Sequence, residues 1–189
     1  METEILDEND YNKVRNVQYA GFGERLLASI LDSLIMMTPV VGFMYLGFVN
    51  KSLTYLLASA VVGMLYKPIM EGVWGATLGK MILKIKMVDT NLDQIDLGQS
   101  ILKNAIYIIS SLIGILGHFW LVSTDAFQES EGFVEASAAG QESPYTMVGY
   151  IWLVVILISC FAMLASNLKQ TLHDRLAGTY CVKNSTFDE

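Results

Sequence analysis

Four long apolar stretches divide the chain, and short polar segments separate them. They cover residues 26–48, 53–70, 101–122 and 147–168. A helix of roughly 20 apolar residues spans the hydrocarbon core of a bilayer, which is about 30 Å thick. The pattern therefore predicts an all-α membrane protein, a bundle of four transmembrane helices. Pro39 lies inside the first stretch, where its missing N–H predicts a bend.

Basic residues predict how these helices are oriented, because cytoplasmic loops carry an excess of Lys and Arg. Nearly all of them lie before the first stretch, around the segment between the second and third, or after the fourth: Lys13, Arg15, Arg25, Lys67, Lys80, Lys84, Lys86, Lys103, Lys169, Arg175 and Lys183. Only Lys51 falls on the opposite side. Both termini are therefore expected to be cytoplasmic.

The polar segments predict further local structure. In KIKMVDTNLDQIDL, Ile85 and Met87 alternate with lysines, which is typical of a strand, and Ile95 and Leu97 fit a returning strand. The later GTYCVK is also rich in strand-forming residues. We expect a small cytoplasmic β-hairpin or sheet from these segments. The acidic segment 123–145 is expected to form a mobile outer loop.

We accordingly divide the chain into an acidic cytoplasmic tail (1–18), a transmembrane domain (19–183) and a C-terminal tail (184–189). The polar, acidic start of the chain does not resemble a cleaved leader, which needs a basic start and an apolar core.

Composition supports a membrane protein and argues against several other classes. Hydrophobic residues make up 53% of the chain and charged residues 16%, whereas roughly a quarter of a soluble domain is charged. The net charge of −7 does not favour nucleic-acid binding, which requires a basic surface. Two cysteines and two histidines suggest no metal site, and GATLGKM lacks the spacing of a phosphate-binding loop. We expect neither an enzyme nor a bound cofactor.

Asp32 is the strongest candidate for a functional residue. It lies about seven positions inside the first apolar stretch, roughly 10 Å from its start at 1.5 Å per residue. A charged, unpartnered acid at that depth costs several kcal/mol, and intramembrane acids often bind ions or protons. We therefore predict an ion- or proton-binding role for Asp32. The alternative is a structural clamp to a Ser, Thr or Lys of another helix.

Five further residues could support such a site. Arg25 begins the first helix and Asp174 follows the last one, so the two could meet at the inner surface as a structural or gating pair. Their alternatives are an interfacial anchor for Arg25 and a helix cap for Asp174. Lys67 and Lys103 are candidate counter-charges to Asp32, or else extend to the membrane surface. His118 could carry a proton or simply pack within the bundle.

Three strings resemble motifs of the RDD family of membrane proteins: GFGERLLASILDSLI, GATLGKMILKIKMVD with DLGQSILKN, and TLHDRLAGTYCV. They occur in the family's order over about residues 19–183. The resemblance implies that Arg25, Asp32 and Asp174 match the arginine and the two aspartates that give the family its name. Lys103 stands where many members have arginine, a change that loses the planar guanidinium. The resemblance also implies a bacterial inner membrane and a role in transport.

Two functions remain open from the sequence. The first is a transporter, specifically a monovalent cation/proton antiporter that uses Asp32. The second is a non-transporting scaffold or accessory subunit whose Arg and Asp residues are structural. Since four helices enclose little space, we expect a homo-oligomer.

Overall fold

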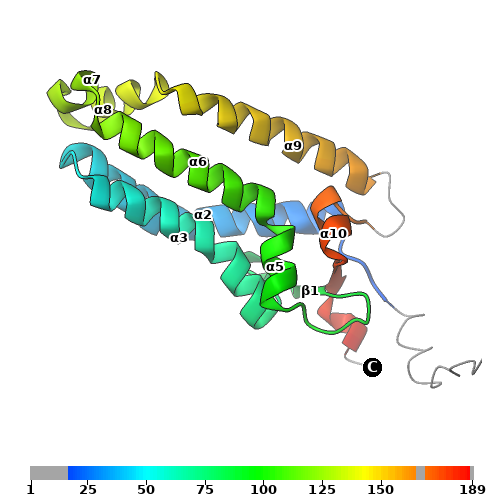
Figure 1. Ribbon diagram of the computed structural model, residues 1–189. Coiled ribbons are helices and arrows are strands. Elements are labelled where there is room, and N and C mark those ends of the chain that lie inside the picture. The colour runs from blue at the N-terminus through cyan, green and yellow to red at the C-terminus, as the bar shows by residue number, and fades with distance from the viewer. Residues whose placement is uncertain (1–16, 165–168, 188–189) are drawn as a thin grey trace, which may run out of the picture.

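The computed structural model describes residues 17–164 and 169–187. Its four long helices are α2 (Phe22–Val49), α3 (Leu53–Trp74), α6 (Ala105–Val122) and α9 (Met147–Leu164). Each is long and apolar enough to cross a membrane, the last together with the short helix η1 (Pro144–Thr146). They run side by side as an up-and-down bundle (Figure 1). The predicted four-helix membrane protein is confirmed.

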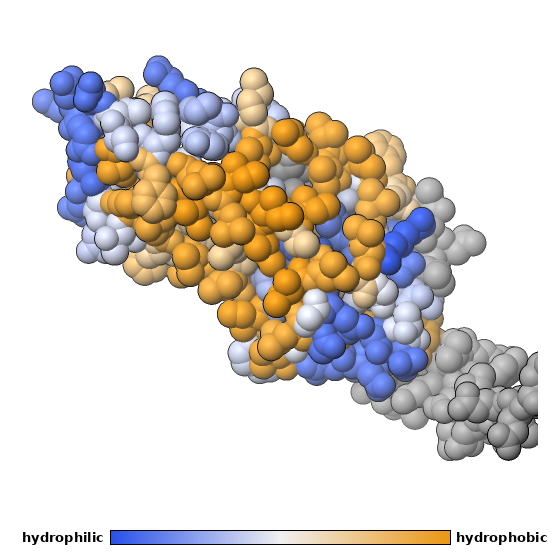
Figure 2. Space-filling model, in the orientation of Figure 1, coloured by the Kyte–Doolittle hydropathy of each residue, from blue (hydrophilic) through white to orange (hydrophobic). Residues whose placement is uncertain are grey.

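The outer surface of the bundle is apolar. In α9, Ile151, Leu153 and Phe161 are all more than half exposed. Figure 2 shows hydrophobic residues along the middle of the bundle and hydrophilic residues gathered toward its two ends. Exposed apolar side chains of this kind are stable in contact with lipid tails rather than water. The bundle is therefore membrane-embedded.

Two of the predicted helices differ in detail from the observed ones. The third stretch forms two helices, α5 (Leu97–Lys103) and α6, because the backbone of Asn104 leaves helical geometry. The side-chain amide of Asn104 donates to the carbonyl oxygen of Ser100. Helix α2 continues through Pro39. The end predicted for the fourth span, 165–168, lies outside the described residues, as does most of the predicted N-terminal tail.

One end of the bundle, here called the sheet end, carries the predicted β element. Strand β1 (Ile85–Val88) pairs antiparallel with β2 (Tyr180–Lys183), and Tyr19 adds a bridge to Val182. The predicted returning strand at Ile95 and Leu97 is wrong. Only a single bridge joins Val88 to Gln94, because Asp96 caps α5 with a reciprocal bond to Gln99 and so starts a helix.

Two short helices complete the sheet end: α4 (Leu78–Ile82) and α10 (Leu172–Ala177). A small apolar core joins the sheet to the start of α2, with Ala20, Ala28, Met87 and Cys181 among its buried members. The last segment of the described chain, η2 (Asn184–Phe187), follows β2.

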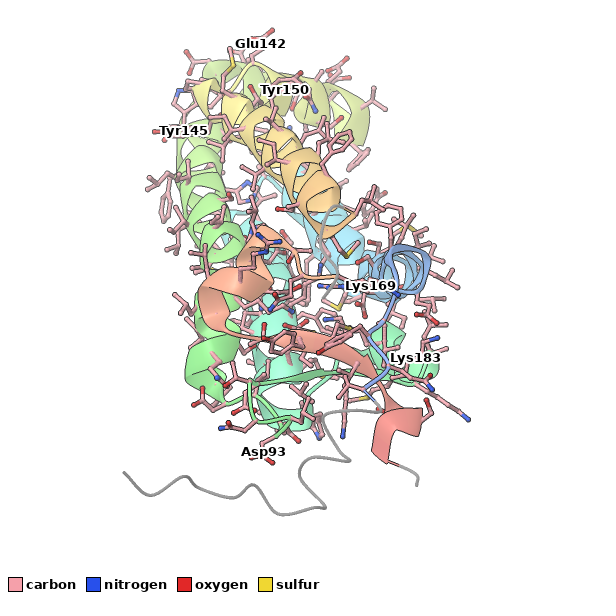
Figure 3. All side chains as sticks on the ribbon, turned by 90° about the vertical axis from the view of Figure 1, so that its right-hand side faces the viewer. Asp93, Glu142, Tyr145, Tyr150, Lys169 and Lys183 are labelled. Carbon is pink, nitrogen blue, oxygen red and sulfur yellow. The ribbon has the colours of Figure 1, made fainter. Side chains whose placement is uncertain are left out.

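The opposite end, here called the cap end, is formed by α7 (Asp125–Glu129) and α8 (Gly132–Gln141). The expectation of a mobile outer loop is therefore wrong for this segment. Phe127 and Ala136 are fully buried against Phe48 and Leu56, so apolar contacts hold the short helices on the bundle. Asp93 and Glu142 mark the two ends of the molecule in Figure 3.

Candidate functional site

Asp32 is buried among hydrogen-bond donors rather than beside a lysine. Asp32 is only 4% exposed. One carboxylate oxygen, Oδ1, accepts from Tyr66 Oη at 2.7 Å and from the Gly79 amide at 2.8 Å. The other, Oδ2, accepts from Thr77 Oγ1 at 2.7 Å. The carboxylate thus joins α2 to α3 and to the start of α4.

Close contact between α4 and α2 makes this arrangement possible. Helix α3 ends at Gly75, whose left-handed φ of 71° turns the chain back toward the bundle. Thr77 then caps α4 in an extended conformation. A Cβ at Gly79 would overlap the carbonyl oxygen of Ala28 and lie 3.0 Å from the Asp32 amide nitrogen. Only glycine fits this position.

A cavity of about 500 Å³ lies beside Asp32, between α2, α3 and α6. Polar residues in its lining are Ser33, Tyr66, Tyr107 and Lys67. Met36, Met37 and Val40 supply an apolar side. The structure thus places Asp32 and Lys67 on one cavity, while Lys67 forms no ion pair with any described residue.

Glu71 occupies the centre of a second polar cluster, nearer the sheet end. It is 2% exposed, and its carboxylate pairs with Lys80 and with Lys103, the latter at 2.7 Å. Asn104 donates to the same carboxylate at 3.2 Å. The carboxylate therefore connects α3 with α4 and α5. Burial opposes the charge on Lys80, but Glu71 more than offsets this effect and raises the pKa of Lys80.

Arg25 and Asp174 meet next to this cluster. Arg25 Nη2 lies 2.5 Å from Asp174 Oδ2, and Nη1 donates to the carbonyl oxygen of Lys169 at 2.9 Å. Figure 3 shows Lys169 beside the start of α2. Asp174 also accepts from the Thr171 amide as part of a capping box. Burial raises the pKa of Asp174, but Arg25 and Lys103 more than offset this, so the net pKa is lowered.

The remaining predicted residues lie elsewhere. Lys103 is not a counter-charge to Asp32, because its ammonium lies 2.7 Å from Glu71 and 4.0 Å from Asp174. His118 lines a separate cavity toward the cap end. The prediction that Lys103 neutralises Asp32 is therefore wrong, and His118 is not part of the Asp32 site.

Sequence reasoning missed the central role of Glu71 and its partner Lys80. One observation could have identified it. Lys67 and Lys103 fall at the same-side ends of the second and third apolar stretches, Lys80 lies in the segment between them, and Glu71 is the acid that directly follows the second stretch. Buried lysines require a partner, so such an acid is expected among them.

The buried cluster carries one excess positive charge. Its three cationic side chains belong to Arg25, Lys80 and Lys103, and its two carboxylates to Glu71 and Asp174. Burial lowers the pKa of Lys103 to about 8, against the raising effect of Glu71, and the nearby charge of Lys80 adds to the lowering. Loss of the Lys103 proton would make the cluster neutral.

This pKa leads to a pH-dependent stability. In the unfolded chain the lysine pKa is about 10.4, so between pH 8 and pH 10 the unfolded state binds more protons than the folded state. The free energy of unfolding should therefore rise by about 1–2 kcal/mol between pH 7.5 and pH 9.5. Reversible unfolding in detergent micelles measures it. The rise should be missing in Lys103→Met, and an equal rise in both proteins would contradict the assignment.

Comparison with known proteins identifies the family. The model of the RDD family matches residues 19–178, a range that holds all four long helices, Asp32, Glu71 and the Arg25–Asp174 pair. No curated protein and no solved structure gives a significant match. The match spans most of the chain, and we conclude that it belongs to the RDD family and is an integral membrane protein.

Proposed function

We propose that this chain is a transporter that exchanges a monovalent cation for protons at the cavity beside Asp32. The observation that carries this proposal is a buried carboxylate on the wall of a cavity of about 500 Å³ inside a membrane-spanning bundle. Ser33, Tyr66 and Tyr107, which carry hydroxyl groups, line the same cavity. Carboxylate and hydroxyl oxygens are suitable ligands for hard cations.

The hydrogen bonds around Asp32 are compatible with both a charged and a protonated carboxyl group. Oδ1 accepts two bonds, from Tyr66 and Gly79, and these persist in either state. Oδ2 contacts Thr77, whose hydroxyl can donate to a carboxylate or accept from a carboxylic acid. A proton on Oδ2 could therefore be donated to Thr77 Oγ1, while both bonds to Oδ1 remain.

Lys67 supplies the competing charge in this mechanism. Lys67 lines the same cavity, so its positive charge balances the negative charge of Asp32 when the cavity holds no cation. A cation that binds near Asp32 must then do so against repulsion from Lys67. Release of a proton from Asp32 or from Lys67 would make the cavity more negative and so favour cation binding. Binding of the cation and binding of the proton therefore exclude each other, as exchange in opposite directions requires.

The test is cation-driven proton flux in proteoliposomes that contain the full chain. Asp32→Asn should lower the flux at least tenfold. An asparagine can still accept from Tyr66 and Gly79 and donate to Thr77, so the variant removes the charge and keeps the contacts. Its free energy of unfolding should stay within about 1 kcal/mol of the wild type.

Asp93→Asn is the matched control, because Asp93 is an exposed aspartate on the loop before α5. It should leave flux unchanged. Thr77→Ser should also retain flux, whereas Thr77→Val should lose it, because valine cannot exchange the hydrogen-bond direction. Equal flux in wild type and Asp32→Asn would exclude Asp32 from transport.

The three hydrogen bonds on Asp32 also favour a second candidate, a non-transporting scaffold or accessory subunit. In that case the carboxylate only holds α2, α3 and α4 together. The wild type would then show no cation-driven flux, and no cation would raise its melting temperature. Cation-dependent stabilisation that disappears in Asp32→Asn would favour the transporter.

A further inference from the structure

A second cavity, of about 310 Å³, lies between α2, α6 and the cap-end helices. Its wall combines apolar side chains such as Met44 and Phe48 with polar ones such as His118, Gln141 and Ser143. Gly114 opens onto it, since a Cβ added there would meet nothing within 4 Å.

The two cavities follow the same faces of the same two helices. On α2, the residues Ser33, Met37 and Val40 line the first cavity, and Met44 and Phe48 line the second. Successive members are three or four residues apart, so they share one side of the helix. The cavities thus follow one another along α2.

Helix α6 shows the same succession. Tyr107 lines the first cavity, and Gly114, His118 and Leu121 line the second. Spacings of seven, four and three residues again place them on one side of the helix. Helix α3 packs closely on both α2 and α6, whereas α2 and α6 have few close backbone contacts with each other. Both cavities therefore lie in the space between α2 and α6.

A narrow contact separates the two spaces. Tyr107 Oη donates to the carbonyl oxygen of Gly63 at 3.1 Å. A Cβ on Gly63 would lie 3.6 Å from that hydroxyl and 3.8 Å from Val40 Cγ2, so α2, α3 and α6 converge at one level. From Val40 to Met44 is one helical turn, about 6 Å. On α6, Tyr107 and Gly114 are about two turns apart, roughly 10 Å, so one to two layers of side chains separate the cavities.

The charge at the cap end fits a cationic solute. Five acids lie on or beside the cap helices: Asp125, Glu129, Glu131, Glu135 and Glu142. Lys51 is the only basic residue of the described chain at this end, and its ammonium is bound to Ser130 and lies over the Phe127 ring. Such an excess of carboxylates raises the local concentration of cations.

We propose that the two cavities are the two halves of one cation route between α2 and α6, closed in this conformation at Val40, Gly63 and Tyr107. The cavity at His118 is then the half that opens toward the cap end, and the cavity at Asp32 is the half that opens toward the sheet end. This inference rests on the proposed transport function, but its first test does not require transport.

That test is thiol labelling of single-cysteine variants in oriented vesicles, in a background with Cys160→Ser and Cys181→Ala. Gly114→Cys places a thiol in the cap-end cavity, and Ser33→Cys places one of nearly unchanged size in the other. A membrane-impermeant, positively charged thiol reagent should label the first at least tenfold faster from the cap side. It should label the second at least tenfold faster from the sheet side.

Gly42→Cys is the matched control. Gly42 is an exposed position of α2 that lines neither cavity, and a Cβ added there would meet nothing within 4 Å. It should react slowly from both sides. The route is contradicted if Gly114→Cys reacts no faster than Gly42→Cys from either side, or if Ser33→Cys and Gly114→Cys prefer the same side.

Filling the second cavity separates this proposal from the proposed function. Gly114→Leu adds a side chain into open space and should reduce cation-driven proton flux at least tenfold without lowering stability, whereas Gly42→Leu should keep it. Full flux in Gly114→Leu together with loss in Asp32→Asn would overturn the route and leave the transporter standing. Absence of flux in the wild type would overturn the transporter, and labelling would still decide whether the cavities open to opposite sides.

Discussion

Replacing Glu71 with alanine should lower the free energy of unfolding by about 3–5 kcal/mol, because removal of one partner leaves buried charges uncompensated. Lys80 and Lys103 would both lose their carboxylate partner, and each residue is only 8% exposed. Reversible unfolding in mixed detergent micelles gives the value. This is the largest single effect that we expect from a side chain of the sheet end.

Glu24→Ala is a suitable comparison, since Glu24 forms an ion pair with Lys183 in which both side chains are more than a third exposed. It also caps α2 through the Gly21 amide, so its removal should cost no more than about 1.5 kcal/mol. A loss of similar size in both variants would show that Glu71 has no special role.

A triple variant tests the cause of the Glu71 effect. Glu71→Leu with Lys80→Met and Lys103→Met removes all three charges and leaves the Arg25–Asp174 pair in place. Because well-packed apolar side chains can replace a buried ion cluster at little cost, the triple variant should be more stable than Glu71→Ala. If it is not, the loss comes from packing rather than from unpaired charge.

Gly79→Ala should destabilise the protein by about 3 kcal/mol, near the upper range for overpacking. The added methyl group would overlap the carbonyl oxygen of Ala28, which belongs to the backbone of α2 and cannot move aside. Helix α4 would have to shift, and the bond from the Gly79 amide to Asp32 would lengthen. Thermal unfolding in detergent measures the loss.

The matched control is Gly42→Ala on the same bundle. Gly42 lies in the interior of α2 and has open space around it, so alanine should stabilise the helix by about 0.5–1 kcal/mol. A difference of less than 1 kcal/mol between the two alanine variants would mean that α4 and α2 tolerate a wider separation than their contact implies.

The sequence was sufficient for features that depend on local pattern. Length and hydropathy predicted four spans, and the positions of Arg25 and Asp174 at the ends of the first and last helices predicted where these residues meet. Alternation predicted β1, and residue type predicted β2. Each of these inferences needs only short-range periodicity or the side of the membrane on which a residue falls.

Features that depend on long-range contacts could not be predicted in the same way. Glu71 reaches Lys103, 32 positions away. Lys103 ends α5, and the apolar pattern conceals the break between α5 and α6 at Asn104. The partners of Asp32 were hydroxyl groups and one backbone amide, and nothing in the spacing of Tyr66, Thr77 and Gly79 indicates that they converge. The acidic composition of the segment that contains α8 favoured the prediction of a loop. Its small residues instead form a helix, and Ala136 on the buried side of that helix packs on the bundle.

The sheet end joins the two extremes of the chain, and this has a consequence for biosynthesis. Arg25 and Asp174 are 149 residues apart, and β2 pairs with a strand that precedes the last two spans. Since a ribosome releases the amino-terminal part first, the four helices enter the bilayer before the segment with Asp174 and β2 emerges. Until then Arg25 and the edge of β1 have no partner. A chain interrupted before residue 171 would therefore carry an open strand edge on β1 and an Arg25 guanidinium without its carboxylate partner.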